Sequence, residues 1–469
     1  MIPLRTYEGK TIGVFGLART GLAALSALFA SKARVLAYDD ALAHNPGDLR
    51  MKSLPVPLNN LYEADFSQLD ALMLAPGVPL THPAPHPLVL KARAAHVPVI
   101  GDIEIFAKAQ SDLPPHGLIA VTGTNGKSTT AALLSHMFAA CGRDVALAGN
   151  IGIPVLGLEA LDAGGVYVFE MSSFQIDLTH SLDADVAILL NISPDHLDRH
   201  GDMAGYVAAK ARLFMMQGPQ HLAVISVDDP WSAELARRLP QRTVPISVRQ
   251  PLDDGVYVTD GGDLIDARSL AEGARLIGSL GDLPTLRGRH NWQNAAAAYV
   301  AGLELGLDAA GIMASFASFP GLAHRCERVG VADDVVYIND SKATNIDAAA
   351  TALAAFDQIR WIAGGRAKST DLAPLEPFFG RIKKAYLLGE AAPDFAKALD
   401  GKLDHVVCGT MAAAVAAAIH DARPGETVLL SPACASFDHY RDFEARGDDF
   451  RAIVRRLLPH VTGPDEVRS

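Results

Sequence analysis

Residues 122–129 are the feature of the sequence that most constrains the fold. They read Thr-Gly-Thr-Asn-Gly-Lys-Ser-Thr and lie between the apolar run 118–122 and the Ala- and Leu-rich stretch 129–140. Glycines let the backbone bend so that successive N–H groups face one anion, and the positive end of the following helix adds to the attraction. The order of strand, glycine-rich loop, Lys-Ser pair and helix predicts a phosphate-binding loop after a buried parallel strand.

This loop is a shortened variant of the usual phosphate-binding pattern. The pattern G-x-x-x-x-G-K-S would need a glycine at position 121, where this chain has Val121. Lys127 is suited to neutralise phosphate oxygens, and the Ser128 hydroxyl is suited to hold Mg²⁺. A glycine-rich turn without a ligand is the alternative interpretation. The candidate phosphate ligands are Gly123, Thr124, Asn125, Gly126, Lys127, Ser128 and Thr129.

Short β-branched runs alternate with Ala- and Leu-rich stretches along most of the chain. In the N-terminal part, strand-like runs at 11–15, 34–38 and 71–74 accompany a helical stretch at 21–31. Such alternation is typical of parallel sheets with crossover helices. The alternation begins again at residue 118 and once more near residue 335, with later strand-like runs at 335–338, 360–363, 385–388 and 427–430.

Segments rich in Pro, Gly and small polar residues indicate two boundaries, at 111–117 and at 319–321. The Gly- and Asp-rich segment 241–282 predicts a β-hairpin embellishment outside the core. The expected fold is α/β with three consecutive domains: a Rossmann-like domain over 1–107, a central P-loop-type domain over 108–320 and a Rossmann-like domain over 321–469.

The composition excludes several classes of protein. Lys and Arg number 41 against 53 Asp and Glu, a net charge of −12, whereas nucleic acids and anionic membranes are bound by excess positive charge. The four cysteines form no C-x-x-C pair, which argues against a disulfide framework and favours a reducing compartment. No apolar run approaches the roughly 20 residues of a membrane span. We therefore expect a cytoplasmic protein that binds no nucleic acid and inserts into no membrane.

Further chemistry-bearing residues follow the central strands. Glu170 ends the run 166–169 and His196 follows the run 186–190, so both belong to the sheet edge where ligands of parallel sheets collect. Taken by position alone, a structural role is an equal alternative for Glu170 and the favoured interpretation for His196. Lys210, taken alone, is typical of a lysine on a helix surface.

The N-terminal segment 13–21 resembles a dinucleotide-binding turn but has the wrong spacing, because Phe15 stands where G-x-G-x-x-G needs its tightest bend. Asp39 and Asp40, at the end of the next strand, are suited to meet a ribose or base. Three interpretations stay open for this turn: a nicotinamide cofactor, another nucleotide-diphosphate group, or a plain strand-to-helix turn.

Two loops of the last domain, 339–345 and 363–369, each follow a strand and offer cations, hydroxyls and helix N–H groups. Together they indicate a site for a small dianion, with solvated turns as the alternative. The neighbouring Arg325 adds a cation, or forms a structural salt bridge. Cys434 follows a buried run and has no evident histidine partner, which favours a packed thiol over a nucleophile.

These motifs resemble the Mur ligases of peptidoglycan synthesis over essentially the whole chain. The loop 122–128 is shared with the wider group that includes the folylpolyglutamate synthases. The segments 340–345 and 430–436, followed by Asp438 and 443–447, are similar to the D-glutamate-adding branch of the family. Arg366 departs from that pattern, which has an acidic residue there, and the segment from His196 to Lys210 is about one residue shorter.

The resemblance implies an ATP-dependent amide ligase that joins D-glutamate to UDP-N-acetylmuramoyl-L-alanine through an acyl phosphate, with two Mg²⁺ ions, as a monomer. It implies that Lys127, Asn150, His196 and Lys210 are catalytic, with Lys210 carrying a CO₂-derived carbamate. The implied metal ligands are Ser128, Glu170, His196 and Lys210. The implied nucleotide ligands beyond the loop are Asn294, Arg325 and Asp340.

The same resemblance implies the binding residues of the two other substrates. Those of the uridine diphosphate group are Arg19, Thr20, Asp39, Asp40 and Gly77. Those of the amino acid are Lys342, Thr344, Lys368, Ser436 and Phe443. The alternatives are a folylpolyglutamate-type ligase, a dehydrogenase that uses the first domain, and a nucleotide-binding protein without catalytic activity.

Overall fold

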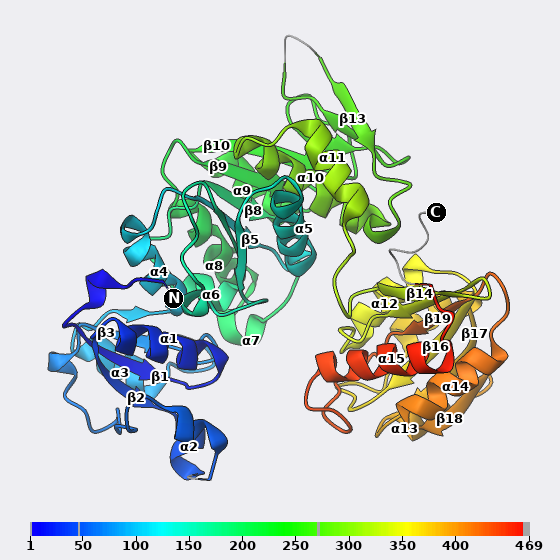
Figure 1. Cartoon of the computed structure of the whole chain (residues 1–469), viewed down its shortest axis with the longest axis horizontal. Helices are drawn as coiled ribbons and strands as arrows, with labels where there is room; N and C mark the ends of the chain where they lie inside the picture. Colours follow the sequence, from blue (N-terminus) through cyan, green and yellow to red (C-terminus); the bar gives the residue numbers. More distant parts are fainter. Residues whose placement is uncertain (1, 46, 270–272, 463–469) are drawn as a thin grey trace. The chain divides into compact units, whose positions relative to one another are not determined.

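The computed structural model describes residues 2–45, 47–269 and 273–462. The chain divides into two compact units, Met1–Phe319 and Pro320–Ser469. The described strands form three sheets: a four-stranded and a nine-stranded sheet in the first unit, and a six-stranded sheet in the second (Figure 1). The expected series of α/β folds is therefore confirmed.

The first sheet is parallel, in the order β2-β1-β3-β4. The predicted strands are confirmed in β1 (Thr11–Phe15), β2 (Arg34–Tyr38) and β3 (Ala71–Leu74). Each is a short, mostly apolar run; β1 and β3 pair on both edges, and β2 pairs with β1. The sheet also holds β4 (Val99–Ile100). Its helices are α1 (Arg19–Ala30), α2 (Asp40–His44), α3 (Pro87–Ala94) and α4 (Asp102–Ala109).

The central sheet has the order β13-β12-β11-β10-β9-β8-β5-β7-β6, parallel from β11 to β6. Its strands are β5 (Gly117–Thr122), β6 (Val145–Gly149), β7 (Val166–Glu170), β8 (Val186–Leu189), β9 (Leu222–Ser226), β10 (Arg242–Ser247), β11 (Val256–Val258), β12 (Asp263–Asp266) and β13 (Arg275–Ser279). Its helices are α5 (Lys127–Ala140), α6 (Ser173–Asp177), α7 (Leu197–His200), α8 (Met203–Met215), α9 (Pro230–Arg238), α10 (Arg289–Glu304) and α11 (Ala309–Ser318).

The prediction of a β-hairpin embellishment over 241–282 is wrong in its main point. β10 is a parallel strand of the central sheet, and the antiparallel strands β11 to β13 extend that sheet. Val256, Val258 and Leu264 are buried in the same core as α5 and α10. The short apolar runs are separated by Gly and Asp turns, so their membership of a larger core depends on pairing with β10 and is invisible in the local sequence.

Both faces of the central sheet are covered by helices, and consecutive residues of β5 serve opposite cores. Ile119 and Val121 pack with α5, α10 and α11, whereas Leu118 and Ala120 pack with α4, α6 and α8. A strand buried on both faces reads as a continuous apolar run, which is why the sequence of β5 shows no alternation.

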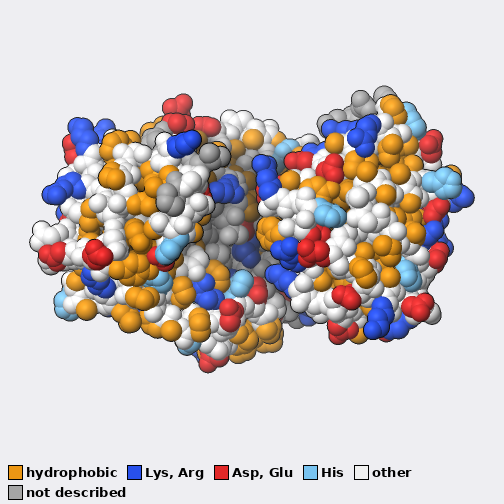
Figure 2. All heavy atoms as spheres, turned by 90° about the horizontal axis from the view of Figure 1, so that it is seen from below, with side chains coloured by type: hydrophobic (Ala, Val, Ile, Leu, Met, Phe, Trp, Pro, Cys, Tyr) orange, Lys and Arg blue, Asp and Glu red, His pale blue; other side chains and the backbone are white. Residues whose placement is uncertain are grey.

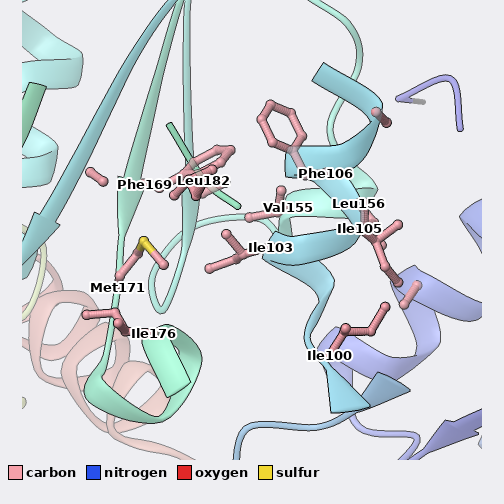
Figure 3. Packing of buried hydrophobic residues seen from close by; sticks show 14 of the residues in the cluster. Ile100, Ile103, Ile105, Phe106, Val155, Leu156, Phe169, Met171, Ile176 and Leu182 are labelled. Atoms are coloured by element: carbon pink, nitrogen blue, oxygen red, sulfur yellow. The ribbon is translucent and has the colours of Figure 1, made fainter. Parts of the chain in front are cut away.

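Helix α4 packs into the second of these cores. Figure 3 shows its side chains Ile103, Ile105 and Phe106 among residues of the central sheet and its loops. The Phe106 ring lies edge-on to Phe169 of β7, with ring centroids 4.9 Å apart. This helix follows the first sheet directly, so its packing joins the first sheet to the second within one compact unit.

The six-stranded sheet has the order β14-β15-β19-β16-β17-β18, with only the β14–β15 pair antiparallel. Its strands are β14 (Glu327–Ala332), β15 (Val335–Asn339), β16 (Ile359–Gly364), β17 (Ile382–Leu388), β18 (His405–Gly409) and β19 (Thr427–Leu430). Its helices are α12 (Ile346–Ala355), α13 (Ala392–Leu399), α14 (Met411–Asp421) and α15 (Phe443–Leu457). Cys434 is buried in one of its two cores, as expected of a packed thiol, and burial raises its pKa to about 12.

Charge on the surface is mixed. On the face seen in Figure 2, acidic and basic side chains are interspersed. Within the described residues, every helix is too short or too polar to span a bilayer.

The packing of α4 gives a test of the core of the first unit. Phe106→Ala removes a fully buried ring, and we expect it to lower the free energy of unfolding by about 3–5 kcal/mol. Urea denaturation measures the change. The matched control is Phe29→Ala, because Phe29 is 50% exposed and its loss should cost under about 0.5 kcal/mol. Equal effects of the two substitutions would contradict the assigned packing.

Candidate functional site

The predicted phosphate loop connects β5 to α5. Gly126 precedes the helix with φ of 84°, a left-handed conformation that favours glycine. A Cβ atom at this position would lie 2.5 Å from Asn294 Oδ1. Glycine is therefore required both by the backbone angle and by the close approach of α10.

The cation of the loop, Lys127, folds back over it. Its Nζ donates hydrogen bonds to the carbonyls of Gly123, at 2.9 Å, and Thr124, at 2.7 Å. Ser128 is buried in the first turn of α5. The loop therefore gathers an ammonium group, a hydroxyl and the N-terminus of a fourteen-residue helix at one place.

Lys210 of α8 does not lie on a helix surface, so that interpretation of the residue taken alone is wrong. Its side chain is buried, and its Nζ donates to Gly123 O at 2.9 Å. The Nζ also lies 4.7 Å from the centroid of the Tyr206 ring, whose hydroxyl contacts Thr124 Oγ1. Burial, and then the nearby Lys127, hold the pKa of Lys210 well below its usual value.

Glu170 ends β7 inside the protein. Its Oε1 accepts a hydrogen bond of 2.7 Å from Asn150 Nδ2, whereas its buried Oε2 has no hydrogen-bond partner. A buried carboxylate oxygen without a partner is costly, and a cation or a donor from a ligand would remove that cost. Among the described residues no three His, Cys, Asp or Glu side chains gather as a metal-binding group, so a metal here would need ligands of other types.

A cavity of about 430 Å³ brings several predicted residues together. Arg19, Thr20 and Gly77 reach it from the first sheet, and Lys127, Asn150 and His196 reach it from the central sheet. All six were predicted from the sequence as substrate-binding or catalytic residues.

His196 lines this cavity from the segment before α7. Its backbone is left-handed, with φ of 52°, and its ring packs on Phe174 with centroids 4.8 Å apart. Its Nε2 lies 3.3 Å from Asp195 Oδ2. The ring is thus oriented by its neighbours while one side faces the cavity.

Asp39 and Asp40 are not among the residues that line this cavity. The Asp39 carboxylate accepts hydrogen bonds from the N–H groups of Leu17, at 2.6 Å, and Leu42, at 3.0 Å. Asp40 accepts a hydrogen bond from the Tyr62 hydroxyl at 3.1 Å. In this structure Asp39 therefore fixes the turn after β1 and caps α2.

Most predicted residues of the second unit follow β15, β16 and β19, which are neighbours in the sheet, whereas Arg325 precedes β14. The Lys342 Nζ lies 3.8 Å from the centroid of the Phe443 ring. Ser436 is buried, Thr344 is half-buried and Lys368 is exposed. Asn294 lies in the first unit, and Arg325 and Asp340 lie in the second.

Arg446 of α15 connects the segments after β15 and β19 by hydrogen bonds. The sequence analysis assigned this residue no role of its own. Its buried guanidinium donates to the carbonyls of Cys434, at 3.0 Å, and Ser341, at 2.7 Å, and to Ser341 Oγ at 2.9 Å. Burial lowers the pKa of Arg446 to about 10. An arginine within an otherwise helical pattern gives no signal of such burial.

Asp340 is a buried carboxyl group directly after β15. It accepts hydrogen bonds from Ser431 Oγ, at 2.8 Å, and from the Cys326 N–H, at 3.2 Å. Burial raises its pKa from 3.8 to about 7 in spite of these donors.

Two family models match the chain: "Mur ligase middle domain" over residues 121–302 and "Mur ligase, glutamate ligase domain" over residues 324–434. Curated relatives match nearly its whole length. A UDP-N-acetylmuramoylalanine–D-glutamate ligase from Phenylobacterium zucineum is 50% identical, over 97% of this chain and 98% of the relative. A protein of the same name from Nitrobacter hamburgensis is also 50% identical, over 98% and 99%. The chain therefore belongs to the Mur ligase family, and within it to the group of these UDP-N-acetylmuramoylalanine–D-glutamate ligases.

Solved structures of other Mur ligases share the fold. A UDP-N-acetylmuramate–alanine ligase from Thermotoga maritima is 15% identical with a TM-score of 0.58, over 96% of this chain and 99% of that one. A UDP-N-acetylmuramoyl-L-alanyl-D-glutamate–2,6-diaminopimelate ligase is 19% identical with a TM-score of 0.57, over 84% and 94%. At such low identity the likeness concerns the fold alone.

The raised pKa of Asp340 predicts a pH dependence of stability. A carboxyl group with a higher pKa in the folded state contributes stability that is complete below about pH 4 and is lost as the pH rises through about 7. Between these values, the free energy of unfolding of the wild type should fall relative to that of Asp340→Asn. Urea denaturation of both proteins across this window measures the difference. A difference that stays constant with pH would contradict the buried, protonated carboxyl group.

Proposed function

We propose that the chain is an ATP-dependent ligase that joins D-glutamate to UDP-N-acetylmuramoyl-L-alanine in peptidoglycan synthesis, releasing ADP and phosphate. The observation that carries the proposal is the cavity in which Lys127, Asn150 and His196 meet Arg19, Thr20 and Gly77. The names of relatives that are 50% identical over nearly the whole chain supply the substrates.

The chemistry explains why such a site needs positive charge. A carboxylate is a poor electrophile, so amide formation at neutral pH requires an activated leaving group. Transfer of the γ-phosphoryl group of ATP to the alanine carboxylate forms a P–O bond and releases ADP. The D-glutamate amine then attacks the acyl phosphate, the C–N bond forms, and phosphate leaves as the amine loses its proton. Both steps concentrate negative charge on neighbouring oxygens.

The phosphate loop supplies part of the stabilisation. In the proposal Lys127 exchanges its two carbonyl partners for charged phosphate oxygens, which are better acceptors. Asn294 of α10 is a further proposed nucleotide ligand. Its Oδ1 is buried without a hydrogen-bond partner and lies against Gly126. Arg325 and Asp340 are the other residues proposed to bind the nucleotide.

The residues at the sheet edge fit a divalent cation. The unpartnered Glu170 Oε2 is a hard anionic oxygen of the kind that Mg²⁺ prefers. The other proposed ligands are the Ser128 hydroxyl, His196 and a carbamate on Lys210. Bound Mg²⁺ would neutralise phosphate charge and polarise the oxygens of the reacting groups. Glu170 itself is held in place by the Asn150 side chain.

Lys210 is the residue proposed to carry a carbamate group. Its lowered pKa increases the fraction of neutral amine, which is the form that attacks CO₂ with loss of a proton. The product would be an anionic oxygen ligand beside the phosphate loop, where Lys127 offers an opposite charge.

The two remaining substrates are assigned to different domains. The proposed domain boundaries lie at 107/108 and 320/321. Residues of the first domain would bind the uridine diphosphate group, and those of the last domain would bind D-glutamate. The residues proposed for the first group are Arg19, Thr20, Asp39, Asp40 and Gly77, and those for the second are Lys342, Thr344, Lys368, Ser436 and Phe443. The four cysteines are free thiols, which supports a cytoplasmic location.

Removing the ammonium group of the loop tests the proposal. Lys127→Ala should lower kcat by about 100-fold or more, on the order of 3 kcal/mol of transition-state stabilisation. Phosphate release in the presence of ATP, UDP-N-acetylmuramoyl-L-alanine and D-glutamate measures it. The control is Lys32→Ala, because Lys32 is 80% exposed. Near-normal turnover of Lys127→Ala would remove the assigned role.

The acyl phosphate has its own test. When the carboxylate of the UDP-linked acceptor carries ¹⁸O, one labelled oxygen should appear in the released phosphate, because that oxygen leaves with the phosphoryl group. Mass spectrometry of the phosphate measures it. Unlabelled phosphate would exclude the intermediate, and product formed with folate and L-glutamate instead would move the chain to the folylpolyglutamate branch.

A further inference from the structure

One residue outside the phosphate loop holds the loop by three hydrogen bonds. Asn191 follows β8, and its backbone carbonyl accepts a hydrogen bond from the Thr124 N–H at 2.8 Å. Its side chain grips Asn125 on both sides: Oδ1 accepts from the Asn125 N–H at 2.8 Å, and Nδ2 donates to the Asn125 carbonyl at 3.2 Å. This grip works in only one orientation of the Asn191 amide, because a flipped amide would set donor against donor and acceptor against acceptor.

The orientation of Asn191 is set by Gln293 of α10. Gln293 Oε1 accepts a hydrogen bond from Asn191 Nδ2 at 3.1 Å, so the nitrogen of Asn191 must face Gln293. The side chain of Gln293 is buried, so water offers it no alternative partners. Gln293 therefore decides which end of the Asn191 amide is presented to the loop.

Gln293 is in turn oriented by the end of β9. Its Nε2 donates to Ser226 Oγ at 2.8 Å and to Asp228 Oδ2 at 3.2 Å. The Asp228 carboxylate also accepts from Ser247 Oγ, at 2.6 Å, and from the Val248 N–H, at 3.0 Å. An ionised carboxylate can only accept hydrogen bonds, so it fixes the direction of every bond that follows.

We propose that Asp228, Gln293 and Asn191 form a positioning relay that fixes the conformation of the phosphate loop for nucleotide binding. The relay starts at a group that can only accept and ends at Asn125, whose N–H it occupies. In the proposal the three side chains act through the loop and not by direct contact with the nucleotide. The inference rests on the proposed ATP site and goes beyond it.

Nucleotide affinity in the absence of acceptor substrates tests the relay. Gln293→Leu and Asn191→Ala should each weaken binding of Mg·ATP by about 5- to 10-fold, the range of one lost hydrogen bond in a rigid site. Because both substitutions break the same chain, the double variant should lose about the same factor and not the product of the two. Isothermal titration calorimetry on the full-length protein measures all four affinities.

Kinetics and stability separate positioning from a general structural role. The KM for ATP should rise by a similar factor, whereas the KM values for D-glutamate and for the UDP-linked acceptor should stay unchanged. The matched control is Gln241→Ala. Gln241 is also buried, but its side chain donates to Phe214 O, at 2.9 Å, and not to Asn191 or the phosphate loop. That control should leave ATP affinity unchanged.

Three results would overturn the relay: wild-type affinity in Asn191→Ala, multiplying effects in the double variant, or an equal rise of all three KM values. Asn191 is only half-buried, so its variant reports even if Gln293→Leu does not fold. If the wild type itself fails to bind Mg·ATP, the proposed function fails before the relay is reached, which keeps the two failures apart.

Discussion

The parallel pairing of β5 with both β7 and β8 is the constraint on which the site depends. The register sets Val121 beside Glu170 and Thr122 beside Leu189. The carboxyl ends of the three strands therefore reach one edge of the sheet together, and the segments that follow them meet there. A slip of this register by one residue would turn Glu170 to the opposite face of the sheet and separate the phosphate loop from the segment that begins at Asn191.

This edge of the central sheet contains buried ionisable groups that lower the stability of the fold. Lys210 and Glu170 are buried ionisable groups, and burial of such groups costs free energy unless hydrogen bonds or opposite charges offset it. Lys210 donates hydrogen bonds to a carbonyl and a hydroxyl, and one oxygen of Glu170 has no hydrogen-bond partner. The two apolar cores on either side of the sheet supply the stability that lets the fold keep these groups in place.

The strands with strong local patterns were predictable from the sequence, and those defined by their neighbours were not. β1, β2, β3 and β19 have the predicted bounds because they are compact apolar runs. β6 was missed, since its sequence Val-Ala-Leu-Ala-Gly favours a helix as much as a strand and only pairing with β7 decides. β4 has two residues, too few for any periodicity.

The residues of the site also fall into those that the local sequence predicts and those that it does not. The phosphate loop follows from its own residues, because glycine, lysine and helix lie next to each other in the chain. The burial of Lys210 and Arg446, and the contacts of Gln293, depend on elements distant in sequence, so no local pattern reports them. Which residues line the cavity with Lys127 was foreseen only through the family resemblance, since the first sheet and the central sheet meet there by tertiary packing.

Arg366 connects the loop after β16 to a neighbouring loop. The Arg366 guanidinium contacts both oxygens of Glu390, at 2.9 and 3.0 Å. Both side chains are 55% exposed, so solvent screens the pair and its contribution to stability is small. Its effect is on position: it joins the loop after β16 to the loop after β17, and the Glu390 N–H donates to Asp438 of the loop after β19. The three loops are therefore connected through Glu390, which contacts both Arg366 and Asp438.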